Sequence, residues 1–166
     1  MLEVILDKDG FAFIRVYIKM LNSPSMAYIK YKVDSGANRT AISRDHLNNL
    51  GYDDNWIKSG ELLTGDDRPT VATGEPIDGC YIVTLPEVNI GGCVGYNWPF
   101  LTSLNIDFRN LLGTDTMRFF NWEFNYERGI CRFELIPGMR IILFNQKVQT
   151  IHSMDELESD NPLLSC

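Results

Sequence analysis

The sequence contains no long apolar run. No stretch of its 166 residues approaches the ~18 consecutive apolar residues that a membrane-spanning helix requires. Residues 1–7 read MLEVILD, and acidic residues interrupt this run before it reaches the length of a signal-peptide core. We therefore expect no membrane partner and a cytoplasmic location.

Metal-binding and disulfide patterns are also missing. None of the four cysteines forms a Cys-x-x-Cys pair, and neither of the two histidines stands at ligand spacing. We expect no metal and no cofactor, and we expect reduced thiols of which some are buried. His46 and His152 accompany no nucleophile motif, so we interpret both as solvated side chains.

Positive charge is scarce. The chain has 15 Lys and Arg against 22 Asp and Glu, a formal net charge of −7. A nucleic-acid-binding protein needs a basic face, so nucleic acid is not an expected partner. The length suggests one domain, which we place at residues 1–150. Residues 151–166 are acidic, and we interpret them as a flexible C-terminal tail, with an inhibitory or self-processed segment as the alternative.

Short runs rich in β-branched and aromatic residues dominate the chain, and no internal repeat is present. We expect strands over residues 2–6, 11–20, 27–33, 40–42, 61–64, 80–85, 87–92, 94–100, 121–126, 130–136 and 141–144. Residues 7–10 (DKDG) are typical of a hairpin turn between the first two runs.

Two short helices are expected among these strands. Ser43 is a suitable N-cap for a helix over 44–50 that Gly51 would close. Thr114 or Asp115 can cap a second helix that runs to Phe120. Residues 52–60 have the composition of a surface loop.

A single carboxylate at a tight turn is the most informative motif. Residues 33–37 read Val-Asp-Ser-Gly-Ala, so a strand delivers Asp34 into a Ser-Gly turn. Residues 111–115 read Leu-Leu-Gly-Thr-Asp, and residues 72–76 read Ala-Thr-Gly-Glu-Pro between two expected strands. The first motif occurs once in the chain.

These three motifs, in this order, resemble the retropepsin-like aspartic proteases. Residues 33–37 are similar to the catalytic loop, residues 72–76 to the flap tip, and residues 111–115 to the strand behind the loop. The resemblance covers roughly residues 27–136 and implies an all-β, single-domain, closed β-barrel or sandwich. It further implies one or two short helices and a flap hairpin.

The resemblance also implies a chemistry. A single Asp-Ser-Gly loop supplies one carboxylate, so the second would be Asp34 of the partner subunit in a homodimer. The implied partner is a peptide or protein substrate, and the implied activity is aspartic endopeptidase. The implied catalytic residues are Asp34, Ser35 and Gly36. The implied substrate-binding residues are Ala37, Ala72, Thr73, Gly74 and Glu75.

Each assignment has a simpler alternative. The Asp34 motif could be an ordinary turn, and Thr73-Gly74 could be a plain hairpin turn. Asp115 could be a second catalytic acid, but a helix-capping carboxylate is the better interpretation. The whole domain could be a peptide-binding or dimerisation module without turnover.

Overall fold

The computed structural model describes residues 1–144. In this part the strands are β1 (Leu2–Ile5), β2 (Phe13–Lys19), β3 (Met26–Val33), β4 (Glu61–Leu62), β5 (Cys80–Ile90), β6 (Cys93–Ser103), β7 (Leu111–Leu112), β8 (Phe120–Asn125), β9 (Ile130–Leu135) and β10 (Ile141–Leu143). The helices are α1 (Arg44–Asn49), α2 (Asp54–Lys58) and α3 (Thr114–Met117), and η1 (Gly65–Asp67) is a 3-10 turn.

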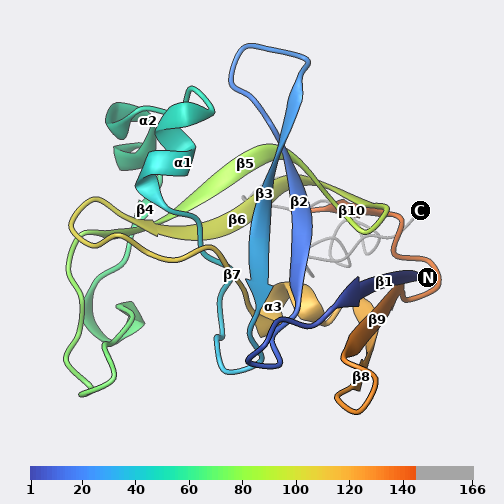
Figure 1. Ribbon diagram of the computed structural model, residues 1–166. Coiled ribbons are helices and arrows are strands. Elements are labelled where there is room, and N and C mark those ends of the chain that lie inside the picture. The colour runs from blue at the N-terminus through green and yellow to red at the C-terminus, as the bar shows by residue number, and fades with distance from the viewer. Residues whose placement is uncertain (145–166) are drawn as a thin grey trace, which may run out of the picture.

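The strands form two sheets. The larger has the order β10-β6-β5-β2-β3-β7, with β4 paired to β5, and the smaller has the order β1-β9-β8. Figure 1 shows the β2–β3 pair crossing the long β5–β6 hairpin, so the larger sheet curls into a half-barrel. The expected all-β class is confirmed.

The core lies on the inner side of this curl. Strand β2 alternates strictly, with Ile14, Val16 and Ile18 buried and the residues between them exposed, as a half-buried strand requires. Trp98 of β6 is fully buried and its ring contacts those of Phe119 and Phe144. These aromatic contacts hold β6 of the long β5–β6 hairpin against the core.

The helix over 44–50 is confirmed, including its ends. Ser43 is the N-cap of α1, and its hydroxyl accepts a hydrogen bond from the His46 backbone N–H at 3.2 Å. Gly51 follows with a φ of +97°, a left-handed conformation that glycine adopts without strain.

Several local expectations were wrong. Residues 40–42 form a single bridge, from Ala41 to Leu101, where a strand was expected, and α3 ends at Met117 where Phe120 was expected. Residues 7–10 do form a turn, in which Gly10 N–H donates to the Asp7 carbonyl at 3.0 Å, but β1 pairs with β9 and not with β2. The turn therefore connects two sheets. Residues 54–58 form helix α2 where a loop was expected, because the Asp53 carboxylate accepts from Trp56 N–H and caps the turn.

Cys80, Cys93 and Cys131 are free thiols and fully buried, as expected for some of the cysteines. Burial raises the pKa of Cys93 to about 12 and that of Cys131 to about 11. Within residues 1–144 no helix is long and apolar enough to span a membrane. The expected boundary at residue 150 and the expected tail lie outside the described residues.

Candidate active site

Asp34 lies directly after β3, where the backbone of its own loop holds the carboxylate. Asp34 N–H donates to the Leu112 carbonyl at 2.9 Å, which continues the parallel pairing of β3 with β7. The Oδ1 atom accepts from Gly36 N–H at 2.9 Å, and Ala37 N–H donates to the Asp34 carbonyl at 3.1 Å. The carboxylate is thus fixed in direction before any ligand binds.

The residues next to Asp34 face outward. Asp34 is half-buried, whereas Ser35 and Gly36 are exposed on the single chain. A Cβ atom at Gly36 would lie 3.2 Å from Asp34 Oδ1, so glycine leaves room for the carboxylate against the backbone. The loop therefore exposes the Ser35 hydroxyl next to a half-buried acid, and Gly36 adds no side chain that would crowd the carboxylate.

A buried hydrogen-bond network supports the loop from behind. Thr40 Oγ1 donates to Asp115 Oδ1 at 2.7 Å and accepts from Gly113 N–H at 3.1 Å. Thr40 N–H also donates to the Asp115 carboxylate, and the Thr40 and Thr116 hydroxyls lie 2.7 Å apart. Thr40 and Thr116 are fully buried. These bonds join the two sequence motifs.

Gly113 permits this close approach. A Cβ atom there would lie 2.6 Å from the Arg39 carbonyl carbon and 2.9 Å from the Ala37 oxygen. Thr114 N–H donates to that same Ala37 oxygen at 2.9 Å. Any side chain at position 113 would push the two segments apart.

The expectation for Asp115 was wrong in its detail. Helix α3 begins after Gly113 and has no side-chain cap. The Asp115 carboxylate binds Thr40 instead, so it serves neither as a helix cap nor as a second acid beside Asp34. Sequence spacing could not reveal this role, because Thr40 and Asp115 are 75 residues apart.

A groove of about 530 Å³ runs beside the loop. It lies between Gly36 and Ala37 on one side and residues 66–70 on the other. Its lining also includes Asn38, Arg39, Ala41, Leu101, Phe108 and Leu111. Apolar and charged side chains thus line the groove together, whereas Asp34 and Ser35 do not line it. Sequence reasoning missed Leu101 and Phe108, which belong to no motif.

The expected flap residues form a small hairpin at the end of this groove. Val71 N–H donates to the Glu75 carbonyl at 2.9 Å, and Gly74 N–H donates to the Val71 carbonyl at 2.8 Å. All side chains from Val71 to Pro76 are exposed. Figure 1 shows this segment as the green loop that projects below β4.

The base and the tip of this hairpin have different surroundings. Thr70 and Pro69 line the groove, whereas Ala72, Thr73, Gly74 and Glu75 do not. The structure thus brings Gly36 and Ala37 to the groove together with the base of the hairpin. The tip residues are exposed and lie outside the groove.

Within residues 1–144 the Asp34 carboxylate is not bonded to a second acid. In the same range no group of three or more His, Cys, Asp or Glu is placed to hold a metal ion. Asp34 therefore has no bonded second acid among the described residues, although Asp66 and Asp67 line the same groove as Gly36 and Ala37.

One solved structure decides the fold type. A retropepsin-like aspartic protease from Rickettsia conorii superposes with a TM-score of 0.57 at 22% identity, covering 78% of this chain and 86% of the other. The fold is retropepsin-like. No protein-family model and no curated protein matches the sequence.

His46 differs from its expected solvated state. Its Nδ1 atom lies 2.7 Å from Ser43 Oγ and 2.8 Å from Asn110 Nδ2. Ser43 N–H donates to Asn110 Oδ1 at 3.0 Å, which orients the amide. His46 thus fastens α1 to the segment before β7. His152 lies outside the described residues.

Proposed function

We propose that the chain is an aspartic endopeptidase that works as a homodimer, with Asp34 from each subunit in one active site. The observation that carries the proposal is the half-buried Asp34 carboxylate, which its loop backbone orients two residues before Gly36 and Ala37 enter the lining of a groove. The retropepsin-like fold is consistent with this chemistry, and the exposed Ser35 and Gly36 leave the loop open to a second copy.

The two carboxylates would share one proton. Like charges about 3 Å apart do not both ionise readily, so one acid stays protonated. The ionised Asp34 takes a proton from water while the water oxygen attacks the peptide carbonyl carbon. The protonated Asp34 of the partner subunit donates to the carbonyl oxygen. Collapse of the tetrahedral intermediate then breaks the C–N bond: the amine nitrogen takes the proton that Asp34 received from water, and one hydroxyl of the intermediate returns its proton to Asp34 of the partner subunit.

The neighbouring residues would position the dyad and the substrate. The Ser35 hydroxyl donates across the two-fold axis and holds the loops together, and Gly36 N–H orients the carboxylate. Ala37 is small enough to leave space for the substrate backbone. The hairpin tip, residues 72–75, closes over an extended peptide and adds strand-like hydrogen bonds.

The direct test replaces the Asp34 carboxyl group with an amide of the same shape, which cannot share a proton with a second acid. Asp34→Asn should abolish cleavage of a broad peptide library between acidic and neutral pH while circular dichroism stays unchanged. Wild-type activity should rise faster than linearly with protein concentration. Asp45→Asn, an exposed carboxylate of α1, is the matched control and should retain activity. Turnover by Asp34→Asn would rule out this mechanism.

The second candidate is a peptide-binding or dimerisation module of the same fold. The observation in its favour is that the tip residues do not line the groove of the single chain. Peptide capture by wild type, with no product at any pH or concentration, would support this candidate. In that case Asp34→Asn should bind peptides as wild type does.

A further inference from the structure

The two walls of the groove beside the Asp34 loop carry charges of opposite sign. The loop wall includes Arg39, and the facing wall includes Asp66 and Asp67 of η1. All three side chains are exposed. In Figure 1 the segment after β4, which contains η1, lies to the left of the loop that follows β3. A peptide in this groove therefore has carboxylates on one side and a guanidinium on the other.

The carboxylates of η1 have no counter-charge in the described part of the chain. Arg68, the other cation of the groove, is engaged elsewhere. Its Nη1 atom donates to Asp78 Oδ1 at 2.7 Å, and its Nε atom donates to the Gly65 carbonyl at 2.8 Å. The other two ion pairs of residues 1–144 contain no groove residue. Two carboxylates and the Arg39 guanidinium therefore remain uncompensated in the groove.

Hydrogen bonds hold the wall with the carboxylates in place. Asp67 N–H donates to the Thr64 carbonyl at 3.2 Å, which closes the turn. The Arg68 guanidinium connects the start of the turn, at Gly65, to Asp78 on the far side of the hairpin. The two carboxylates thus stand on a segment that is fixed before a ligand arrives.

Apolar side chains form the floor of the groove. Ala41 and Leu101 are buried members of a small apolar cluster, and Phe108 packs against that cluster. All three residues line the groove. The floor therefore suits an apolar side chain, whereas the charges lie at the exposed rim.

An extended peptide would use both parts of the groove. Its successive side chains point to opposite sides of the backbone, so the neighbours of a side chain that enters the floor point toward the rim. Lys and Arg combine an apolar stem with a cationic head, which suits a rim that carries carboxylates above an apolar floor. The net charge of −7 also attracts cationic segments. Arg109 does not offset this attraction, because it lines a separate hollow and not the groove.

We propose that Asp66 and Asp67 determine substrate specificity and select peptides with a Lys or Arg side chain adjacent to an apolar residue. This inference rests on the proposed protease function and names the substrate class of that site. The apolar side chain occupies the floor at Leu101 and Phe108, and the cationic head lies at the η1 carboxylates. In a homodimer each subunit supplies one groove, so the preference holds on both sides of the cleaved bond.

Matched peptide libraries measure this preference directly. Three libraries differ only in carrying Lys, Gln or Glu next to a leucine near the cleaved bond. Wild type should cleave the Lys library with a kcat/KM about fivefold above that of the Gln library, the upper range for an exposed ion pair. The difference should lie in KM, because the contact forms in the bound ground state as well, and it should shrink at high salt.

Neutral and reversed charges at η1 test the assignment. In Asp66→Asn combined with Asp67→Asn, the ratio of Lys to Gln cleavage should fall to about one. In Asp66→Lys combined with Asp67→Lys, the Glu library should become the preferred substrate. Circular dichroism should stay that of wild type in both variants, because the replaced side chains are exposed. A ratio that remains fivefold in the double asparagine variant would overturn the proposal.

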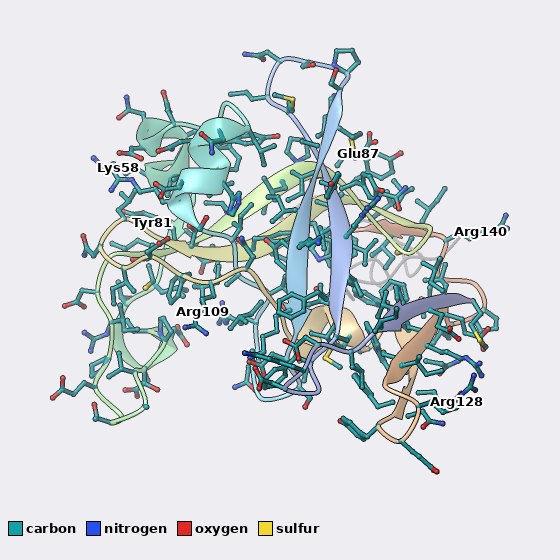
Figure 2. The ribbon with its side chains drawn as sticks, in the orientation of Figure 1. Lys58, Tyr81, Glu87, Arg109, Arg128 and Arg140 are labelled. Carbon is teal, nitrogen blue, oxygen red and sulfur yellow. The ribbon has the colours of Figure 1, made fainter. Side chains whose placement is uncertain are left out.

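Glu87→Gln combined with Glu127→Gln is the matched control, because it removes the same charge elsewhere. Figure 2 shows Glu87 in the upper part of the view and Arg128, the neighbour of Glu127, at the lower right, both away from the segment after β4 at the lower left. This variant should keep the fivefold ratio. An equal loss in the control would mean that the charge of the whole molecule sets the preference, which contradicts the role assigned to η1.

Peptide binding by Asp34→Asn separates this inference from the protease function. By isothermal titration calorimetry it should bind a Leu-Lys peptide about fivefold more tightly than the Leu-Gln analogue, and adding Asp66→Asn and Asp67→Asn should remove the difference. If wild type cleaves no peptide but this binding difference is present, the protease function is wrong and the assignment of the η1 carboxylates stands. If wild type cleaves both libraries equally, or Asp34→Asn binds both peptides equally, the η1 carboxylates do not select the substrate and the inference is wrong.

Discussion

At the scale of single residues, Thr40 connects the Asp34 loop to the strand behind it. Its hydroxyl donates to Asp115 and accepts from Gly113 N–H in a fully buried position. In Thr40→Val the Asp115 carboxylate would lose the hydroxyl as a donor, and Gly113 N–H would lose its acceptor. We expect the free energy of unfolding to fall by about 3 kcal/mol, measured by urea titration.

Thr102 is the matched control for Thr40. It is equally buried, but its Oγ1 atom has no hydrogen-bond partner among the described residues. Thr102→Val should therefore be neutral or stabilising, because it removes an unsatisfied polar atom. An equal loss of stability in the two valine variants would contradict the role assigned to the Thr40 network.

Arg39 is the residue of the loop wall that should determine charge preference in the groove. It lines the groove and forms no ion pair within residues 1–144, whereas Arg68 of the same groove binds Asp78. We expect Arg39→Ala to lower kcat/KM about tenfold for peptides with an acidic side chain near the cleaved bond. Matched peptides with glutamine there should be unaffected. An equal loss on both peptide sets would argue against a charge contact.

Cys93 should make the free energy of unfolding fall as the pH becomes alkaline. Its pKa is raised from the ordinary 9.0 to about 12 because burial disfavours the thiolate. Above pH 9 the unfolded chain loses this proton and the folded chain keeps it, so the free energy of unfolding falls as pH rises toward 12. Cys93→Ala should reduce the slope between pH 9 and 11 in urea titrations. An unchanged slope would assign the alkaline loss to other groups.

At the scale of elements, the hairpin at residues 70–77 offers a test of the flap role. Gly74 has a φ of +88° and Gly129, in the β8–β9 turn, has a φ of +65°, and neither has a neighbouring atom near its missing Cβ. Gly74→Val and Gly129→Val should each cost about 1 kcal/mol of stability through backbone strain. Only Gly74→Val should lower kcat/KM. Similar activity in the two variants would mean that the hairpin does not contact substrate.

The elements that were predicted correctly depend on local signals. Ser43 and Gly51 define the ends of α1, and the period-two alternation of β2 defines which side faces the core. The pairing of β1 was predicted wrongly, because its partner β9 lies more than a hundred residues away and a turn motif carries no information about it. Helix α2 was missed because a single capped turn resembles a loop in composition.

At the scale of the whole molecule, dimerisation should limit activity. Ser35 is exposed on the single chain and is the residue we expect to connect the two loops. Ser35→Ala should weaken the dimer about tenfold, the equivalent of ~1.4 kcal/mol, measured by sedimentation equilibrium. Specific activity should fall in parallel and recover at high protein concentration. A dimer of wild-type affinity would place the essential contacts away from the loops.

The order of the motifs was enough to predict an all-β chain of retropepsin-like fold and to single out Asp34. A strand, a tight turn and a glycine are short-range features, so their residue types reveal them directly. The contact of Thr40 with Asp115 and the groove formed with Leu101 and Phe108 became visible in the folded chain. Each depends on residues distant in sequence, and packing and strand register, which no local pattern encodes, decide which of them meet.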